Sequence, residues 1–344
     1  MPSYEAPLVE LKRIEKSYAP RTATRSRKVR AVRGVSLSIR RGETLGLVGE
    51  SGCGKSTVGR IAARLLEPSG GTLHYQGTDI TNVRGKTLRR LRQHIQYVFQ
   101  DPYASLNPRF TIGRLLEEPL KYNRIGNRRE RQREVVEMLE RIGLDAAYKD
   151  RYPHELSGGQ RQRVGIVRAL MLNPEFVVLD EPVSALDVSV QAQILNLLKS
   201  LQDERSLTYL FISHDLNVVH YISDRVAVMY LGSIVEIADV HDLYERPSHP
   251  YTQALVSSIP AERGAGKRES VILSGDLPDP AALIGGCPFR TRCRHAFDRC
   301  AAEMPDWSEV AEGHAVRCHL WNEEQAGTDV RQTEIFASAG GTGL

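Results

Sequence analysis

Hydrophobic and polar positions along the chain follow different periods in different stretches, and each period predicts an element. Apolar and polar side chains partly alternate over residues 7–18 and cleanly over 35–39, which predicts two strands, the first at a sheet edge. An apolar run over 44–48 and helical spacing over 57–66 predict a buried strand that leads into a helix. Another apolar run predicts a strand over 95–99.

Helical and strand patterns alternate again in the second half of the chain. Helical spacing over 164–172 and 188–201 is interleaved with apolar runs over 176–179 and 208–212. Such alternation predicts an α/β fold with a parallel sheet covered by helices. Residues 226–238 predict a hairpin with a glycine at its turn.

Residues 103–155 break this alternation, because they are charged, arginine-rich and helical in spacing, with prolines between the helical stretches. We interpret them as an inserted helical subdomain. Residues 261–268 are rich in glycine and charge and predict a linker. Residues 327–344 are rich in glycine, alanine and threonine and predict a flexible tail. The expected divisions are residues 1–258, a small cysteine-containing extension over 259–326, and that tail.

Composition and charge argue against a membrane-spanning, a secreted or a nucleic-acid-binding protein. The chain has 344 residues, of which 41% are hydrophobic and 26% charged, and these values are ordinary for a globular protein. No stretch approaches the roughly 18 uninterrupted apolar residues of a membrane-spanning helix, and no secretory signal pattern opens the chain. The formal net charge of +4 is too small to indicate nucleic-acid binding.

The segment between the strand over 44–48 and the following helix matches the phosphate-loop pattern G-x-x-x-x-G-K-[ST]. It reads Gly49-Glu50-Ser51-Gly52-Cys53-Gly54-Lys55-Ser56-Thr57. Backbone N–H groups of such a loop bind phosphate oxygens, and the helix start adds a favourable dipole. Lys55 is expected to reach the β- and γ-phosphates and Ser56 to ligate Mg²⁺. We interpret Cys53 as a small space-filling residue and not as a nucleophile.

Two carboxylates end the buried strand over 176–179. Asp180 is placed to hold Mg²⁺, directly or through water, and Glu181 to polarise an attacking water. Taken alone, an acidic pair at a strand end is explained equally well by a structural role, as a cap for the next helix. The phosphate loop earlier in the chain favours the catalytic interpretation.

The segment Leu156-Ser157-Gly158-Gly159-Gln160 precedes a predicted helix and resembles the signature of the ATP-binding cassette (ABC) family. The order of motifs is similar too: the phosphate loop, Gln100 at a strand end, this signature segment, the acidic strand end, Ser184-Ala185-Leu186-Asp187, and His214 after the strand over 208–212. The resemblance covers roughly residues 7–258. It implies a RecA-like P-loop ATPase core with an antiparallel β subdomain, using ATP and Mg²⁺.

The resemblance also implies that two cassettes enclose two ATP molecules head to tail, so that each ATP site is composite. One cassette supplies the phosphate loop, the acidic strand end, Gln100 and His214. The other supplies Ser157 and Gly159, which would contact the γ-phosphate, and Asp187 contacts across the interface. ATP then bridges the two subunits, and hydrolysis removes the bridge.

Roles within this site follow from the same resemblance. Glu181, His214 and Gln100 are the implied catalytic residues, with His214 holding the γ-phosphate and Gln100 sensing the metal. Ser56, Gln100 and Asp180 are the implied Mg²⁺ residues.

The implied ATP-binding residues lie in three motifs and one strand end. They are Tyr18, Gly49, Ser51, Gly52, Cys53, Gly54, Lys55, Ser56, Thr57, Ser157, Gly158, Gly159, Gln160 and Asp187. Tyr18 is the candidate for stacking on adenine, although a packed aromatic at a strand end fits the pattern equally well.

Two segments resemble the oligopeptide/dipeptide and nickel importer group within that family. They are residues 98–108, which contain Gln100 and the segment after it, and Arg246-Pro247-Ser248-His249-Pro250-Tyr251-Thr252. This group implies a peripheral subunit on the cytoplasmic face of the inner membrane. Its implied partners are a second ATPase in a heterodimer or homodimer, two permease subunits, and a periplasmic or lipid-anchored solute-binding protein, without nucleic acid. The alternative is a soluble cassette ATPase of translation or DNA maintenance.

Four cysteines lie in the C-terminal extension, at Cys287, Cys293, Cys300 and Cys318. A cytosolic chain is not expected to hold structural disulfides, and the spacing lacks the short knuckles of zinc ribbons. Four thiolates in one irregular segment suit a [4Fe–4S] cluster, and some peptide-importer ATPases resemble this segment and carry one. Zinc, or reduced thiols in a small core, are the alternatives. Three histidines nearby are potential substitute ligands: His295, His314 and His319.

Overall fold

The computed structural model describes most of the chain, including part of the predicted extension. The described residues are 6–19, 28–101, 106–184, 186–259 and 285–321. The predicted linker over 261–268 and the predicted tail over 327–344 lie outside them.

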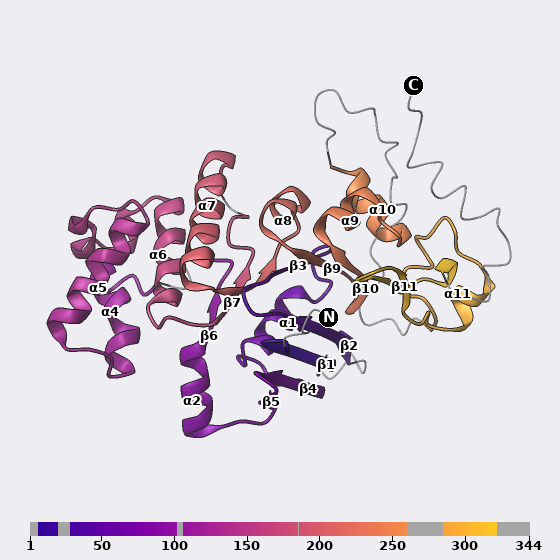
Figure 1. The fold of residues 1–344 in the computed structure, drawn as a ribbon, viewed down its shortest axis with the longest axis horizontal. Helices are drawn as coiled ribbons and strands as arrows, with labels where there is room; N and C mark the ends of the chain where they lie inside the picture. The colour runs from indigo at the N-terminus through magenta and orange to yellow at the C-terminus, as the bar shows by residue number, and fades with distance from the viewer. Residues whose placement is uncertain (1–5, 20–27, 102–105, 185, 260–284, 322–344) are drawn as a thin grey trace.

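Two sheets and the surrounding helices make up the described chain (Figure 1). The strands are β1 (Val9–Tyr18), β2 (Val29–Ile39), β3 (Thr44–Val48), β4 (Gly70–Tyr75), β5 (Thr78–Asp79), β6 (Ile95–Val98), β7 (Phe176–Asp180), β8 (Thr208–Ile212), β9 (Arg225–Tyr230), β10 (Ser233–Asp239), β11 (Ser308–Ala311) and β12 (His314–Val316). The α-helices are α1 (Lys55–Ala62), α2 (Gly85–His94), α4 (Ile112–Tyr122), α5 (Arg128–Arg141), α6 (Gly158–Leu170), α7 (Val188–Arg205), α8 (Leu216–Ile222), α9 (Val240–Glu245), α10 (Pro250–Ser257) and α11 (Asp298–Ala302). Short 3-10 helices are η1 (Ala146–Asp150), η2 (Pro153–Glu155) and η3 (His319–Trp321).

The larger sheet has the order β11-β12-β10-β9-β3-β8-β7-β6. Neighbouring strands from β9 to β6 run parallel, whereas β10, β12 and β11 add in antiparallel fashion. The hairpin predicted over 226–238 is confirmed as β9 and β10, with Gly232 at its turn in a left-handed conformation, φ +87°. The α/β fold and its parallel core are therefore confirmed.

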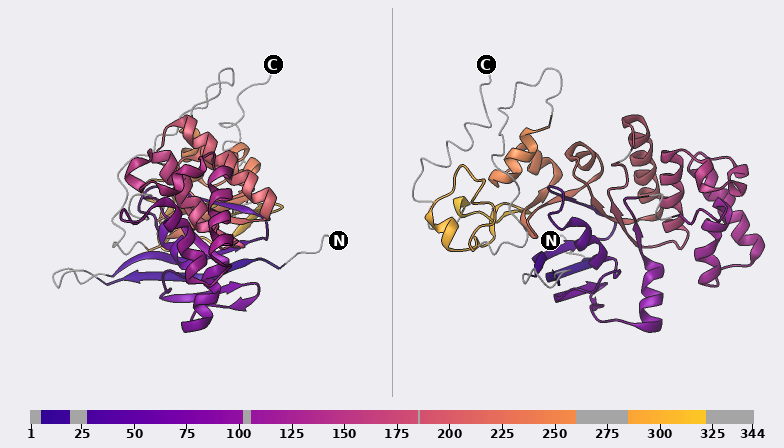
Figure 2. Two further views of the ribbon diagram at one scale, coloured as in Figure 1. Left: turned by 90° about the vertical axis from the view of Figure 1, so that its left-hand side faces the viewer. Right: turned by 180° about the vertical axis from the view of Figure 1, so that it is seen from behind.

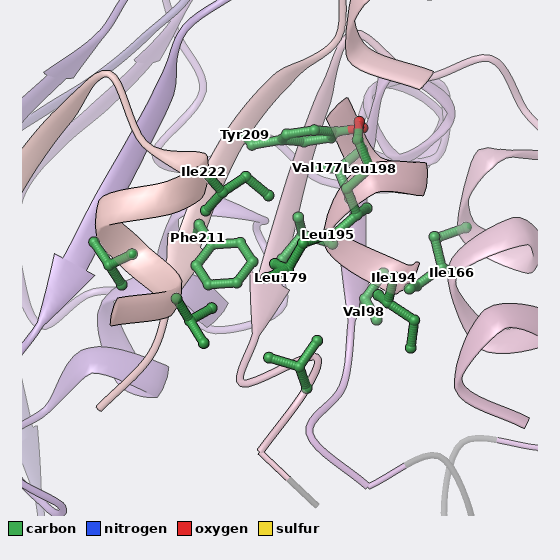
Figure 3. Packing of buried hydrophobic residues seen from close by; sticks show 14 of the residues in the cluster. Val98, Ile166, Val177, Leu179, Ile194, Leu195, Leu198, Tyr209, Phe211 and Ile222 are labelled. Carbon is green, nitrogen blue, oxygen red and sulfur yellow. The ribbon is translucent and has the colours of Figure 1, made fainter. Parts of the chain in front are cut away.

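Side chains of the central strands alternate between two hydrophobic cores. Val177 and Leu179 of β7 pack with residues of α6, α7 and α8 on one face, as Figure 3 shows. Phe176 and Val178 of the same strand pack on the opposite face with α1 and the smaller sheet. Because both faces are covered, strands β3, β7 and β8 are buried at every position.

The smaller sheet corrects one prediction. Its order is β2-β1-β4-β5, so β1 is an inner strand that pairs antiparallel with β2 and with β4. The expectation of an edge strand over 7–18 is wrong. Alternating side chains show which face of a strand is buried, but they do not show whether its second backbone edge finds a partner.

Helices α4 and α5 lie in the stretch where the helical subdomain was predicted. Asn127 begins α5 as an N-cap, and the Glu130 side chain completes a capping box by accepting from the Asn127 N–H at 2.7 Å. Figures 1 and 2 place these helices and the C-terminal strand β11 at opposite ends of the molecule.

The C-terminal extension, described over residues 285–321, joins the main sheet through β12. Buried Glu236 of β10 accepts hydrogen bonds from the Ser248 and His249 N–H groups at 2.7 and 2.9 Å, and its carboxylate meets His314 Nε2 at 2.7 Å. The Trp321 indole donates to the Ser248 carbonyl at 2.9 Å. These contacts dock the extension on β10 and on the residues directly before α10. No helix in the described ranges is long and apolar enough to cross a membrane.

Candidate functional site

Strand β3, the phosphate loop and α1 follow one another as the sequence predicts. Gly49 and Gly54 of the loop have φ angles of +150° and +112°. A Cβ at Gly49 would lie 2.1 Å from the Met229 carbonyl oxygen, and one at Gly54 would lie 2.3 Å from the Ala31 carbonyl oxygen. Only glycine permits this backbone path, which wraps the loop around the start of α1.

The first residues of α1 carry the polar groups that the motif predicts. Lys55 is buried, and its Nζ donates to the carbonyls of Gly49 and Glu50 at 2.7 and 3.1 Å. The Ser56 hydroxyl donates to Asp180 Oδ1 at 2.9 Å. The lysine is thus anchored inside the loop, and the serine is aligned with the end of β7.

Asp180 ends β7 and is almost fully buried. Its second oxygen accepts a hydrogen bond from the Tyr97 hydroxyl at 2.6 Å. Burial and the neighbouring carboxylate raise the pKa of the Tyr97 phenol, so it remains a proton donor at neutral pH. Sequence reasoning missed Tyr97. The only local signal is a tyrosine inside a buried strand, whose hydroxyl needs a partner.

Glu181 lies between two side chains that come from the ends of neighbouring strands. Gln100, after β6, donates from Nε2 to Glu181 Oε2 at 2.7 Å. His214, after β8, places Nδ1 3.2 Å from Glu181 Oε1. Glu181 itself has φ +47°, a conformation that non-glycine residues seldom adopt and that is common at functional sites.

These groups meet in one cavity of about 520 Å³. Its lining residues are Ala31, Ser51, Gly52, Gly54, Lys55, Ser56, Thr57, Gln100, Glu181 and His214. All of them except Ala31 were predicted as site residues. Ala31 belongs to β2, and its carbonyl faces the phosphate loop, so only the fold reveals it.

The remaining predicted ATP-binding residues lie outside the lining of this cavity. Ser157 caps α6 and receives a hydrogen bond from the Gln160 N–H at 3.3 Å, while Gly158 and Gly159 open the helix. A Cβ at Gly159 would lie 2.5 Å from a Val190 methyl group, so this turn packs against α7.

Asp187 and Tyr18 are two further predicted residues outside the cavity. Asp187 caps α7 through the Val190 N–H at 2.9 Å and is exposed, as is Tyr18 at the end of β1. The loop residues Gly49 and Cys53 also lie outside the lining of this cavity. Cys53 is 2% exposed, and burial raises the pKa of its thiol, in agreement with a space-filling role.

The four C-terminal cysteines share one neighbourhood. Cys287, Cys300 and Cys318 are buried, and the Cys287 N–H donates to the Cys300 carbonyl at 2.8 Å. Burial raises the pKa of Cys318, and the other three cysteines raise it further. Burial likewise raises the pKa of Cys293 to about 11. Across the described ranges, however, no three Cys, His, Asp or Glu side chains are arranged to hold a metal ion. As placed, the thiols therefore do not form a ligand set.

Known proteins resemble this chain in sequence and in fold. The family described as ABC transporter matches residues 32–184, and the family described as oligopeptide/dipeptide transporter, C-terminal region, matches residues 235–300. The oligopeptide transport ATP-binding protein AppF of Bacillus subtilis is 53% identical over 92% of this chain and 98% of its own. A putative peptide import ATP-binding protein of Brucella ovis is 51% identical over 91% of this chain and 98% of its own.

Among solved structures, the dimeric ATP-binding cassette MJ0796 bound to ADP and Pi matches with a TM-score of 0.62 and 31% identity, over 67% of this chain and 98% of that chain. The fold and site thus define a P-loop ATPase of the cassette type. The chain belongs to the ABC transporter family, in the branch that carries the oligopeptide/dipeptide transporter C-terminal region. The resemblance of residues 246–252 to that branch is confirmed, and nothing in the comparisons supports a translation or DNA-maintenance ATPase.

Replacing Tyr97 with phenylalanine tests its support of Asp180. The variant keeps the ring but leaves the buried carboxylate with one partner fewer, so we expect the Mg²⁺ concentration for half-maximal ATPase activity to rise about three- to tenfold. A Mg²⁺ titration at saturating ATP measures this. Tyr122→Phe, at a 64% exposed ring, is the control and should behave as wild type. An unchanged Mg²⁺ dependence in Tyr97→Phe would show that Tyr97 contributes only through packing and does not support Asp180.

Proposed function

We propose that this chain hydrolyses ATP on the cytoplasmic face of the inner membrane and thereby powers the uptake of dipeptides or oligopeptides by an ABC importer. The main support for the ATPase mechanism is the position of Glu181. Its two carboxylate oxygens meet Gln100 and His214 in the same cavity as Lys55 and Ser56. The names of the similar proteins support peptides as the transported class.

Glu181 serves as the base that orients and deprotonates the attacking water. The Gln100 amide, which donates to this carboxylate at 2.7 Å, keeps its oxygen directed into the cavity. His214, whose ring is 56% exposed, faces the space where the γ-phosphate of a bound nucleotide would lie. Lys55 exchanges its bonds with the loop carbonyls for phosphate oxygens.

The residues present fit a Mg²⁺ ion accompanying ATP. The Ser56 hydroxyl and the Asp180 carboxylate are aligned within 2.9 Å of each other beside the phosphate loop, and oxygen ligands are those that Mg²⁺ prefers. Bound there, the ion would neutralise charge on the phosphate oxygens. Tyr97 fixes the orientation of Asp180 for this role.

The ATP site is completed by a second cassette. Within this chain, Ser157, Gly159 and Asp187 do not line the cavity that contains the phosphate loop. In the proposed assembly they contact the ATP held by the partner cassette, which is either a second copy or a different chain. The dimeric cassette found among similar structures supports this arrangement.

A groove beside β6 supports contact with the permease. It has a volume of about 200 Å³ and lies between the end of β6, α4 and α6. Phe99 is 44% exposed in this groove, directly before Gln100. A permease helix seated there would contact the segment that positions the catalytic carboxylate. In the proposed assembly this chain acts with two permease subunits and an external solute-binding protein. Its residues 1–258 form the nucleotide-binding domain and 259–326 the extension.

Glu181→Gln tests the catalytic assignment. The amide cannot act as a base, so we expect ATP turnover by the purified transporter to fall by at least about 100-fold, with ATP binding retained. Glu312→Gln, at an exposed position in the extension, is the matched control. Turnover like that of wild type in Glu181→Gln would show that another residue is the base.

The same variant tests the transport assignment in cells. Uptake of a labelled dipeptide or oligopeptide should fall to the level of cells that lack the chain. Uptake that persists after hydrolysis is lost would contradict peptide import powered by this subunit, while leaving the ATPase assignment intact.

The iron–sulfur cluster is a separate proposal for the extension. Its support is the chemistry of the residues and not their present arrangement: four cysteines lie in one small region, and cysteine thiolates are the usual ligands of [4Fe–4S] clusters, but as placed in the described residues they do not form a ligand set. No reaction step depends on it. A structural role in the extension is favoured over electron transfer, since no redox substrate is indicated by the residues nearby.

Anaerobic purification tests the cluster directly. About four iron and four sulfide ions per chain are expected, with loss of iron in Cys318→Ser and retention in Cys53→Ser. Colourless protein without iron would end the proposal. Bound zinc in place of iron would support the second alternative, and the absence of both metals would leave a core of reduced thiols.

A further inference from the structure

The extension reaches the phosphate loop through one arginine. Arg292, between Cys287 and Cys293, donates from Nη1 and Nη2 to the two carboxylate oxygens of Glu50 at 2.8 and 3.1 Å. The Arg292 side chain is only 7% exposed and that of Glu50 21%. A two-pronged pair of this kind, largely removed from water, restricts both side chains strongly.

A second contact holds the backbone of the same loop residue. The Glu50 N–H donates to the Tyr251 hydroxyl at 2.9 Å, and the Glu50 carbonyl accepts from Lys55 Nζ at 3.1 Å. Tyr251 belongs to α10 and is fully buried. The side chain and both backbone polar groups of Glu50 therefore all have partners, and two of these partners, Tyr251 and Arg292, lie outside the phosphate loop.

The arginine is supported by a rigid environment. Phe289, three residues before it, packs against Tyr251 and Tyr230 with ring centroids 5.4 and 5.2 Å away. The Arg292 N–H donates to the Phe289 carbonyl at 3.0 Å. Movement of the cysteine-bearing loop would therefore move the arginine with it.

The charge of Glu50 explains why this pair matters for nucleotide binding. Ser51 and Gly52, the next residues, line the cavity in which the triphosphate is expected. An unpaired carboxylate beside that cavity would repel phosphate oxygens, and partial burial would strengthen the repulsion. Arg292 neutralises this carboxylate without entering the cavity lining.

We propose that Arg292 is a positioning residue of the ATP site, through which the C-terminal extension sets the shape and charge of the phosphate loop. The inference rests on the proposed ATP binding and extends it to the extension. It predicts that ATP affinity depends on Arg292, whereas the rate of hydrolysis at saturating ATP depends on it little. Glu181 and His214 supply the chemistry and are not touched by the arginine.

A double-mutant cycle on the full-length protein tests this. Arg292→Ala should weaken binding of a fluorescent ATP analogue about tenfold and raise KM for ATP with kcat nearly unchanged. The ATP affinity of Arg292→Lys should lie between those of wild type and Arg292→Ala, because one ammonium group cannot reproduce the two-pronged pair. In Arg292→Ala/Glu50→Gln the uncompensated charge is gone, so most of the lost affinity should return. Arg299→Ala, which breaks the exposed pair with Glu303 in the same extension, is the matched control.

The outcomes are distinguishable. Unchanged affinity in Arg292→Ala, with wild-type protein binding ATP normally, overturns the inference and leaves the ATPase assignment standing. Weakened affinity that Glu50→Gln does not restore, together with a lower melting temperature, shows a purely structural contact and also overturns it. Wild-type protein that binds no ATP would refute the proposed function itself. If Arg292→Ala does not fold, Arg292→Lys and the single Glu50→Gln variant decide by the same criteria.

Discussion

Close backbone packing fixes the path of the phosphate loop and ties both sheets to it. The loop leaves β3 between the Met229 carbonyl of β9 and the Ala31 carbonyl of β2, at distances that exclude any Cβ at Gly49 or Gly54. The Cys53 carbonyl accepts from the Gly232 N–H at 2.8 Å, which fixes the loop to the β9–β10 turn. The smaller sheet, the hairpin and α1 are thereby held in one arrangement around the loop.

Two different regions contact the surroundings of this loop. The ends of β6, β7 and β8 bring Gln100, Glu181 and His214 to the cavity, where the catalytic chemistry is proposed. Helix α10 and the extension hold Glu50, outside the cavity lining. In the proposed roles, chemistry and loop geometry are controlled by separate residues, so ATP affinity and turnover are expected to respond to different substitutions.

The sequence predicted those parts of the site that are encoded locally. The strand, loop and helix around Lys55, the acidic end of β7 and the residues after β6 and β8 each lie within a short motif, and the structure brings them together. Tyr97 and Arg292 were missed, because their partners lie 83 and 242 residues away and no local pattern marks them. The position of β1 was wrong for a related reason, since pairing of its second edge depends on β4, a distant strand. Short-range sequence patterns do not reveal which distant residue a polar side chain contacts, or which distant strand pairs with a strand edge.

In the proposed assembly this chain holds half of an ATP site, and its signature segment acts on the nucleotide of the other cassette. The decisive measurement is a structure of the assembled transporter with a non-hydrolysable ATP analogue, which gives the distances from Ser157 to the two γ-phosphates. We predict that Ser157 lies within hydrogen-bond distance of the γ-phosphate held by the partner cassette, and far from the one held by its own phosphate loop. Ser157 in contact with the nucleotide of its own chain, or with neither nucleotide, would contradict the account.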